Sequence, residues 1–175
     1  MKNELLNYQK VCIDFSDLNS VWDLYDRSFP DNERIPFQRL LNTLNEERLM
    51  YAAYREDELI GMYFLFLNEK LVYLSYICVE EKEKKKGYGS RILKHIHEEY
   101  ADCRFVIDIE RVNEEDDNYE EEIHRRAFYL KNGYKSTGVF YHIYGVDYEL
   151  LSYRGAVLKD EWHALILKHW GKFAD

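Results

Sequence analysis

A short lysine- and glycine-rich segment between an apolar stretch and an amphipathic stretch constrains the fold of this chain more than any other feature. The segment runs Glu80-Glu81-Lys82-Glu83-Lys84-Lys85-Lys86-Gly87-Tyr88-Gly89-Ser90 and follows the apolar run Leu71 to Val79. After it, apolar side chains recur at helical spacing from Ile92 to Tyr100. This order predicts a buried strand, a tight loop and a helix that begins near Gly87.

The start of such a helix suits an anion, because its first backbone N–H groups have no intrahelical partner and the helix dipole is positive there. Gly87 and Gly89 permit backbone conformations that a Cβ would obstruct, and the lysines add positive charge. A solvated charge run before an ordinary helix is the alternative. Two common phosphate motifs, G-x-x-x-x-G-K-S/T and G-x-G-x-x-G, do not occur in this segment.

Two segments of the chain resemble the GNAT superfamily of acyl-CoA-dependent N-acyltransferases. Lys84-Lys85-Lys86-Gly87-Tyr88-Gly89 resembles motif A of that family, Q/R-x-x-G-x-G/A, and departs from it at Lys84. Farther along, Ala127, Tyr129 and Gly133 with Tyr134 resemble the family's last helix, in which Ala stands two residues before Tyr and Gly four residues after it. The two matches occur in the order that the family has.

The chain as a whole predicts one domain. At 175 residues it can bury a hydrophobic core, and we expect a single domain over residues 1–175, with residues 153–175 as a C-terminal helical extension. Met1 to Tyr8 lacks the apolar core of a signal peptide, and no stretch of about 18 apolar residues occurs. We therefore expect a cytoplasmic protein with no membrane partner.

Cysteine content and charge narrow the class of partner. Three cysteines, Cys12, Cys78 and Cys103, have no zinc-like spacing, so neither a disulfide framework nor a metal site is expected. The formal net charge of −9 disfavours nucleic acid, because binding to phosphates normally needs a basic face. The acidic charge fits a cationic or polar small partner. The family resemblance implies a small-molecule or protein amine as the acceptor, and we expect a monomer or a homodimer.

The pattern of apolar residues predicts an α/β (α+β) fold. Its expected strands are Val11 to Phe15, Leu49 to Arg55, Leu59 to Leu67, Leu71 to Val79, Arg104 to Glu110, Val139 to Ile143 and Val146 to Leu151. Its expected helices are one from Leu18 capped by Ser16 or Asp17, Phe37 to Asn45, one from Gly87, Tyr119 to Asn132, and Leu158 to Phe173. The order resembles the GNAT fold from about residue 10 to residue 152. It implies a twisted, mixed, mostly antiparallel sheet of about six to seven strands, with a splayed parallel pair and flanking helices.

The resemblance also implies which residues bind the donor, acetyl-CoA. The backbone of Ile77, Cys78 and Val79 would run beside the pantetheine arm. The pyrophosphate would be held by Lys84, Lys85, Lys86, Gly87, Tyr88, Gly89 and Ser90. Tyr129 would protonate the departing thiolate, because a phenol with a pKa near 10 stays protonated at neutral pH. Its other interpretation is a buried aromatic side chain.

The general base has two candidates. An acceptor amine is mostly ammonium at neutral pH, so a carboxylate or a water chain must take its proton. Glu110, at the end of a predicted strand, and Glu33, in the loop Phe29 to Pro36, are both plausible, and Ser75 and Tyr73 could order a water. A solvated surface role is open for each glutamate.

An acidic insertion, Glu114 to Glu122, carries seven acids and displaces Asn113, while His124 stands where the family often has Asn. We expect these acids to be solvated and to stabilise the start of a helix. If they form a polycation-binding lip instead, polyamines or aminoglycosides would be favoured acceptors.

These features predict an N-acetyltransferase that transfers an acetyl group from acetyl-CoA to a primary amine by direct attack in a ternary complex. A catalytically silent acyl-CoA-binding regulatory domain with the same fold is the alternative.

Overall fold

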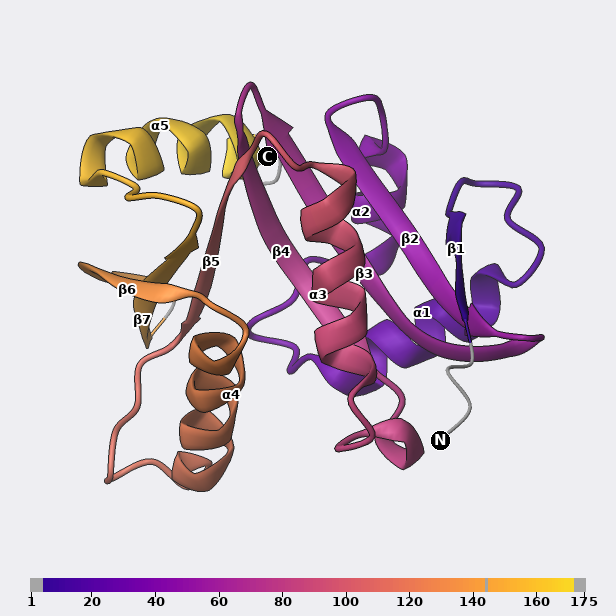
Figure 1. Cartoon of the computed structure of the whole chain (residues 1–175), viewed down its shortest axis with the longest axis horizontal. Coiled ribbons are helices and arrows are strands. Elements are labelled where there is room, and N and C mark those ends of the chain that lie inside the picture. The colour runs from indigo at the N-terminus through magenta and orange to yellow at the C-terminus, as the bar shows by residue number, and fades with distance from the viewer. Residues whose placement is uncertain (1–4, 144, 172–175) are drawn as a thin grey trace. The chain divides into compact units, whose positions relative to one another are not determined.

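The computed structural model describes residues 5–143 and 145–171, which form a mixed α/β structure (Figure 1). The strands within these residues are β1 (Leu6–Lys10), β2 (Arg48–Arg55), β3 (Glu58–Asn68), β4 (Leu71–Val79), β5 (Arg104–Glu110), β6 (Lys135–Ile143) and β7 (Val146–Tyr153). The α-helices are α1 (Leu18–Ser28), α2 (Phe37–Thr43), α3 (Tyr88–Glu99), α4 (Tyr119–Lys131) and α5 (Lys159–Trp170). The strands are hydrogen-bonded in the order β1-β2-β3-β4-β5-β7-β6, and β4 pairs with β5 in parallel. The predicted seven-stranded mixed sheet with a parallel pair is confirmed.

Strand β4 takes part in two compact units of the chain. The first unit comprises Met1–Leu67 and Leu74–Ala101, and the second comprises Asn68–Tyr73 and Asp102–Asp175. The first three residues of β4 pair with β5 inside the second unit, and the rest of β4 belongs to the first unit. The polypeptide therefore passes from one unit to the other within this strand.

In the first unit, helices cover both faces of the strands. Successive side chains of a strand point to opposite faces, so the contacts of two consecutive residues show what lies on each face. Tyr63 of β3 contacts Tyr8 of β1, whose ring stacks on His95 of α3 with the ring centroids 3.6 Å apart. The next residue, Phe64, contacts Tyr76 of β4, which packs edge-on against a tyrosine of α1. Helix α3 therefore lies on one face of the strands and α1 on the other (Figure 1).

The prediction of a first strand at Val11 to Phe15 is wrong. The strand is β1, which pairs antiparallel with β2, and the chain after it turns, since the N–H of Phe15 bonds to the carbonyl of Cys12 at 3.1 Å. Only Leu6 of β1 is buried. A mostly polar edge strand of this kind has a weak hydrophobic pattern. The apolar residues between Val11 and Phe15 have a stronger one, so the strand was predicted there instead.

Helices α1 and α2 begin where the sequence predicts, with differences in detail. Asp17 is the residue before α1, but its carboxylate caps no backbone N–H; it accepts hydrogen bonds from Ser20 and from the Tyr54 hydroxyl, the latter at 2.7 Å. Helix α2 ends at Thr43, two residues earlier than predicted. The core positions of both helices match the predicted helical spacing.

In the second unit, β5 is the centre of the strand pairing. It pairs in parallel with Leu71–Tyr73 of β4, and antiparallel with β7 on its other side. Strands β7 and β6 form the predicted hairpin. Strand β6 begins four residues before the predicted Val139, because the register shifts around Gly138, whose φ is +75°. A glycine in this conformation is typical of a β-bulge, which interrupts the alternating pattern.

Two helices pack on the strands of the second unit through aromatic side chains. Gly133 follows α4 with φ +90°, as a C-terminal glycine does, and Tyr134 packs on Tyr153 of β7 with the ring centroids 5.6 Å apart. Helix α5 contributes the buried Trp162, whose ring meets Tyr73 edge-on at 5.1 Å. The helix expected from Leu158 to Phe173 is α5, Lys159–Trp170, and its expected end at Phe173 lies outside the described residues.

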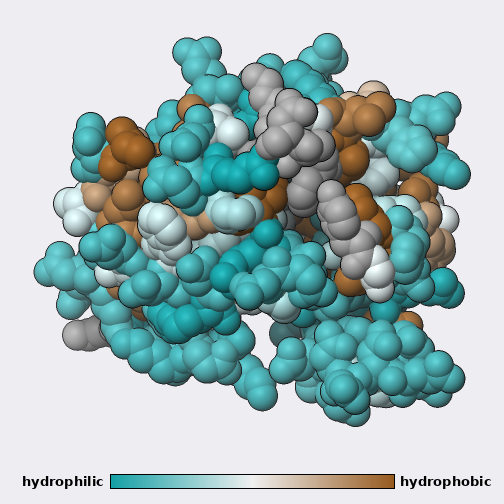
Figure 2. All heavy atoms as spheres, turned by 180° about the vertical axis from the view of Figure 1, so that it is seen from behind, coloured by the Kyte–Doolittle hydropathy of each residue, from teal (hydrophilic) through white to brown (hydrophobic). Residues whose placement is uncertain are grey.

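One face of the molecule is mainly polar. Hydrophilic side chains dominate the face drawn in Figure 2, with separate hydrophobic patches between them. Among the helices of the described residues, none combines the length and the apolar composition needed to span a bilayer.

Candidate active site

The loop after β4 has the backbone geometry predicted for an anion-binding helix start. Gly87 stands immediately before α3 with φ +86°, a left-handed conformation that favours glycine. Arg91 is the first residue of the helix to bond back, from its N–H to the Gly87 carbonyl at 3.2 Å. No side chain caps this end, so the N–H groups of Tyr88, Gly89 and Ser90 face forward without an intrahelical partner. This end of α3 can therefore donate several hydrogen bonds to a phosphate oxygen.

The lysines of the loop are less available than their number indicates. Lys84 pairs with Glu81, and Lys86 lies 3.2 Å from the carboxylate of Glu83. In each pair the glutamate stands three residues before the lysine in the sequence. The predicted positive charge at the loop is thus largely balanced by the loop's own glutamates, and the backbone N–H groups are the stronger part of the site.

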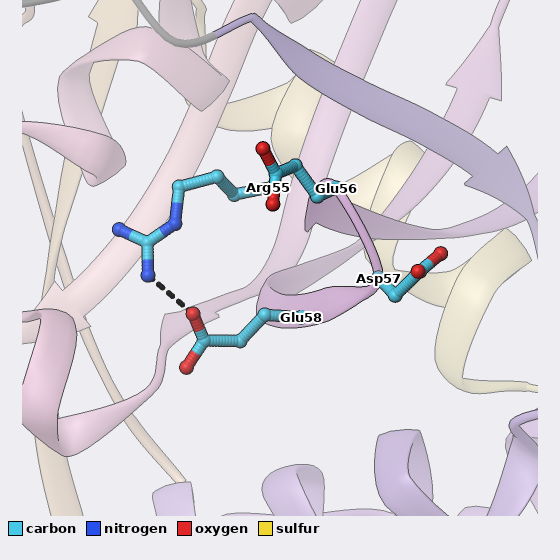
Figure 3. A pocket seen from close by; sticks show the side chains of 4 residues that line it. All are labelled: Arg55, Glu56, Asp57 and Glu58. Carbon is cyan, nitrogen blue, oxygen red and sulfur yellow. Dashed lines mark hydrogen bonds and ion pairs between the residues drawn. The ribbon is translucent and has the colours of Figure 1, made fainter.

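Glu83 and Arg55 hold this loop in place, and neither was predicted as a site residue from the sequence. Glu83 is only 4% exposed and lies 3.4 Å from Arg55 of β2. Arg55 also donates a hydrogen bond of 2.7 Å to the hydroxyl of Tyr88, which is buried at the start of α3. Arg55 and Glu58 point toward each other beside a shallow pocket of about 660 Å³, in which Asp57 points away (Figure 3). This network fixes both ends of the loop to the β2–β3 turn.

The end of β4 carries the residues predicted to accompany the pantetheine arm. Ile77, Cys78 and Val79 are its last three residues, and all three are partly exposed. Burial raises the pKa of the Cys78 thiol to about 12, although a hydrogen bond with Ser28 lowers it in part. The thiol is therefore protonated at neutral pH and unsuited to act as a nucleophile.

Glu33 lies in the α1–α2 loop, at a partly exposed position. The hydroxyl of Tyr76 on β4 accepts a hydrogen bond from the N–H of Ile35 at 3.1 Å and donates to the carbonyl of Glu33 at 3.4 Å. The Tyr25 hydroxyl donates to the carbonyl of Ile35 at 2.9 Å. These contacts give the predicted acceptor loop a defined backbone.

Tyr129 lies on α4 and is 8% exposed. Its ring contacts Phe128 and Tyr134 edge-on, with centroids 5.1 and 5.5 Å away. The side chain thus has a fixed position inside the second unit.

Glu110, the last residue of β5, is engaged with α4 and the segment before it. Its carboxylate oxygen Oε2 accepts a bond of 2.8 Å from Arg125 and one of 3.1 Å from the amide of Asn118. It also lines a pocket of about 650 Å³ whose other walls include Asp116, Asp117 and Glu122. The predicted acidic insertion therefore borders a cavity, and Glu122 is buried with its carboxylate accepting the N–H of Asn113 at 2.9 Å.

Asp108 of β5 is a carboxylate that the sequence analysis did not single out. It accepts hydrogen bonds from the hydroxyls of Tyr73 at 2.8 Å and Tyr141 at 2.5 Å. An aspartate inside the otherwise apolar strand Arg104–Glu110 was the available signal, since such a position normally holds an apolar residue.

The predicted site residues divide between the two units. The donor-binding residues and Glu33 belong to the first unit, and Tyr129 and Glu110 belong to the second. Within residues 5–143 and 145–171, no group of three His, Cys, Asp or Glu side chains is placed to hold a metal ion.

Comparison with known proteins gives one consistent result. Residues 46–136, just over half of the 175, match the family model described as an acetyltransferase (GNAT) domain. No curated protein matches the sequence significantly.

Solved structures share the fold at low sequence identity. A Bacteroides thetaiotaomicron protein assigned to the GNAT family has 18% identity and a TM-score of 0.78, and the match covers 94% of this chain and 96% of that one. An Enterococcus faecium aminoglycoside 6'-N-acetyltransferase has 18% identity and a TM-score of 0.64, with 83% and 95% covered. A GNAT-family acetyltransferase from Elizabethkingia anophelis with acetyl-CoA bound has 18% identity and a TM-score of 0.59, with 87% and 99% covered.

Proposed function

Because the chain belongs to the GNAT acetyltransferase family, we propose that it transfers an acetyl group from acetyl-CoA to a primary amine by direct attack in a ternary complex. The observation that carries the proposal is the start of α3, where Gly87 at φ +86° precedes three forward-facing backbone N–H groups. This arrangement suits the pyrophosphate of a coenzyme A thioester. Two solved structures of the same fold contain coenzyme A or acetyl-CoA, which supports the choice of donor.

In this proposal the chain's residues bind and orient the donor. The N–H groups of residues 88–90 hold the pyrophosphate, and Lys85, for which no ion pair is found in the described part of the chain, adds charge beside it. The backbone of Ile77–Val79 receives the pantetheine arm as an added strand would. The protonated thiol of Cys78 favours direct attack by the amine over an acyl-cysteine route at this position.

Proton transfer completes the proposal. Tyr129 donates a proton to the departing thiolate, because a phenol remains protonated at neutral pH whereas a thiolate needs a proton donor nearby. Glu110 and Glu33 are candidate bases, of which Glu110 already has one oxygen engaged with Arg125. The acceptor is a small molecule or a protein amine. We place the reaction in the cytoplasm.

The direct test is release of free thiol from acetyl-CoA in the presence of a panel of diverse primary amines. The proposal requires at least one amine to give turnover above the rate in water. If acetyl-CoA binds by calorimetry but no amine gives turnover, the chain is a silent acyl-CoA-binding domain. If acetyl-CoA does not bind, both functions are wrong.

Tyr129→Phe tests the acid. The substitution keeps the ring and its packing, so we expect kcat to fall about 100-fold or more while the affinity for acetyl-CoA stays unchanged. Tyr119→Phe, on the same helix, is the matched control and is expected to keep full activity. Equal thiol release by both variants would remove Tyr129 from the mechanism.

Gly87→Val tests the donor site. A β-branched residue is strained at φ +86°, although nothing lies within 4 Å of the new Cβ, so the substitution changes the loop backbone rather than its packing. We expect acetyl-CoA to bind at least about tenfold more weakly, a loss of about 1.4 kcal/mol. Gly138→Val, strained in the same way in β6, controls for the general cost. Unchanged affinity in the Gly87 variant would contradict the assignment.

A further inference from the structure

Asp108 lies in the second unit and contacts tyrosines from two other strands, β4 and β6. Its two carboxylate oxygens accept hydrogen bonds from different phenols, Oδ1 from Tyr73 of β4 and Oδ2 from Tyr141 of β6. Each oxygen keeps a second lone pair for another donor. The pair of phenols therefore fixes the orientation of the carboxylate without neutralising its charge.

Asp108 differs in this respect from Glu110 and Glu149, two other carboxylates on the strands of the second unit. Glu110 pairs with Arg125 at 2.8 Å, and Glu149 pairs with Arg126 at 2.8 Å. For Asp108, no cationic side chain lies within ion-pair distance in the described residues of the chain. A carboxylate removed from water normally has a cationic partner, so this position is suited to a cation supplied by a ligand.

The surroundings are aromatic. The Tyr141 ring stacks on Tyr148 with the centroids 5.3 Å apart, and Trp162 of α5 lies 5.9 Å from Tyr141. Aromatic faces attract ammonium groups, and they also accommodate the apolar carbons attached to them. Tyr73 and Trp162 are buried, whereas Asp108, Tyr141 and Tyr148 are partly exposed. The partly exposed residues of this cluster therefore come from β5, β6 and β7.

We propose that Asp108 binds the ammonium group of the acceptor and takes its proton, so that the acceptor is a cationic primary amine with an apolar carbon next to the nitrogen. This inference rests on the proposed acetyl transfer, names its acceptor-binding residue, and assigns the role of base to Asp108 in place of Glu110 and Glu33. The proton passes from the ammonium nitrogen to a carboxylate oxygen of Asp108. The freed nitrogen lone pair forms the C–N bond to the acetyl carbon as the C–S bond breaks, and Tyr129 protonates the departing thiolate. The second proton of the nitrogen then returns through solvent to Tyr129, and Asp108 loses its own proton to solvent.

The titration of Asp108 supports this role. Desolvation raises the pKa of the Asp108 carboxyl, and the hydrogen bonds from Tyr141 and Tyr73 lower it in part. The groups that face this region are Tyr73 from β4, Tyr141 from β6, Tyr148 from β7, Glu110 farther along β5, and His169 of α5, which contacts Tyr73. A carboxyl with a raised pKa takes a proton from an ammonium more readily than an ordinary aspartate does.

A binding measurement without acetyl-CoA tests the inference independently of catalysis. The probe is n-butylammonium, and n-butanol is its neutral counterpart of similar shape. By NMR titration of the wild-type chain we expect saturable binding of the ammonium, with none of the alcohol. Asp108→Asn should bind the ammonium at least about tenfold more weakly, because one charge-assisted hydrogen bond is lost. Asp102→Asn, an exposed change in the turn before β5, is the matched control.

Two further variants keep the test decisive. Tyr141→Phe removes one phenol but leaves the carboxylate, and should weaken ammonium binding less than Asp108→Asn does. Asp147→Asn, a change at an exposed carboxylate of β7, should leave binding of this small probe unchanged. Equal ammonium binding by wild type and Asp108→Asn, absence of binding to both, or loss of binding only in Asp147→Asn would overturn the inference.

Kinetics separate this inference from the proposed function. With an active amine, kcat/KM of the wild type should fall on the acid side as Asp108 becomes protonated, at a pH above the ordinary range of aspartate. Asp108→Asn should lose this acid limb and about 100-fold or more of kcat/KM, with acetyl-CoA affinity unchanged. Turnover with an unaltered pH profile in Asp108→Asn would refute the inference alone. Ammonium binding at Asp108 without any turnover would refute the acetyl transfer and leave a cation site.

Discussion

Glu83 is the buried acidic residue of the loop between β4 and α3, residues 80–87, which we call the donor loop. Its carboxylate lies between Arg55 of β2 and Lys86 of the loop, at 3.4 and 3.2 Å, and it is almost completely buried. Glu81, two residues earlier, is 80% exposed and pairs only with Lys84. The two glutamates have the same chemistry and different burial, so they form a natural comparison.

We expect Glu83→Gln to destabilise the chain by about 1–2 kcal/mol, because a buried charge-assisted contact is replaced by a neutral one of the same size. The melting temperature should fall by about 2–8 °C. Glu81→Gln, the matched control, should stay within about 0.5 kcal/mol of wild type, since exposed ion pairs contribute little. Urea unfolding of the wild type and the two variants measures the change in the free energy of unfolding, and a thermal scan measures the change in melting temperature. Equal stability of the two variants would show that Glu83 has no anchoring role.

At this scale the sequence predicts residue types better than their partners. Lys84–Ser90 were identifiable as a loop that suits a phosphate because glycines, lysines and a helix start are adjacent in the chain. Glu83 was indistinguishable from Glu81, because its burial depends on Arg55 of another strand. The Asp108 cluster needs Tyr73 and Tyr141, each more than 30 residues away, and pairs of this kind follow from strand order rather than from local pattern.

The junction of α4 with β7 shows how one glycine sets the position of a helix. Gly133 leaves α4 with φ +90°, and a Cβ there would lie 3.0 Å from the ring of Tyr153 on β7. Tyr153 in turn contacts Tyr134 and Phe105. The glycine thus allows α4 to end directly against the aromatic layer of the strands.

We expect Gly133→Ala to destabilise the chain by about 2–4 kcal/mol, of which about 1–2 kcal/mol comes from the left-handed backbone and the rest from contact with Tyr153. Gly138→Ala has a similar φ of +75° with nothing within 4 Å of its Cβ, and it isolates the backbone cost. Chemical denaturation of both variants should therefore show a larger loss at position 133. A loss at position 138 that equals or exceeds it would contradict the packing argument.

Elements with strong periodicity were predicted most accurately. Strand β5 has the predicted bounds Arg104–Glu110, because the apolar pattern that identifies a strand is local. Helix α4 begins at the predicted Tyr119 and ends one residue before the predicted Asn132, close to Gly133, which is a local signal for the end of a helix. Strand β1 and the first part of β6 were missed. One is a polar edge strand and the other contains a bulge, and both conceal the alternation that identifies a strand.

For the whole molecule, donor binding should appear as stability. A ligand that binds only the folded chain stabilises it by about 2.7 kcal/mol at 100 times its dissociation constant. For a chain of this size, we expect acetyl-CoA at that concentration to raise the melting temperature by about 5–10 °C. Differential scanning fluorimetry measures the shift, and Gly87→Val at the same ligand concentration should show a much smaller one. A wild-type chain that melts at the same temperature with and without acetyl-CoA would argue against the donor site.

The pairing of Lys84 with Glu81 and of Lys86 with Glu83 has a consequence for selectivity. A simple anion such as inorganic phosphate can bind these lysines only by exchanging places with a carboxylate, so it gains little free energy. A ligand that also bonds to the backbone N–H groups of α3 and to the edge of β4 adds contacts that the glutamates do not make. Glu81 and Glu83 therefore compete with small anions for Lys84 and Lys86. We expect this loop to bind small phosphate anions weakly and to favour a long thioester that reaches β4.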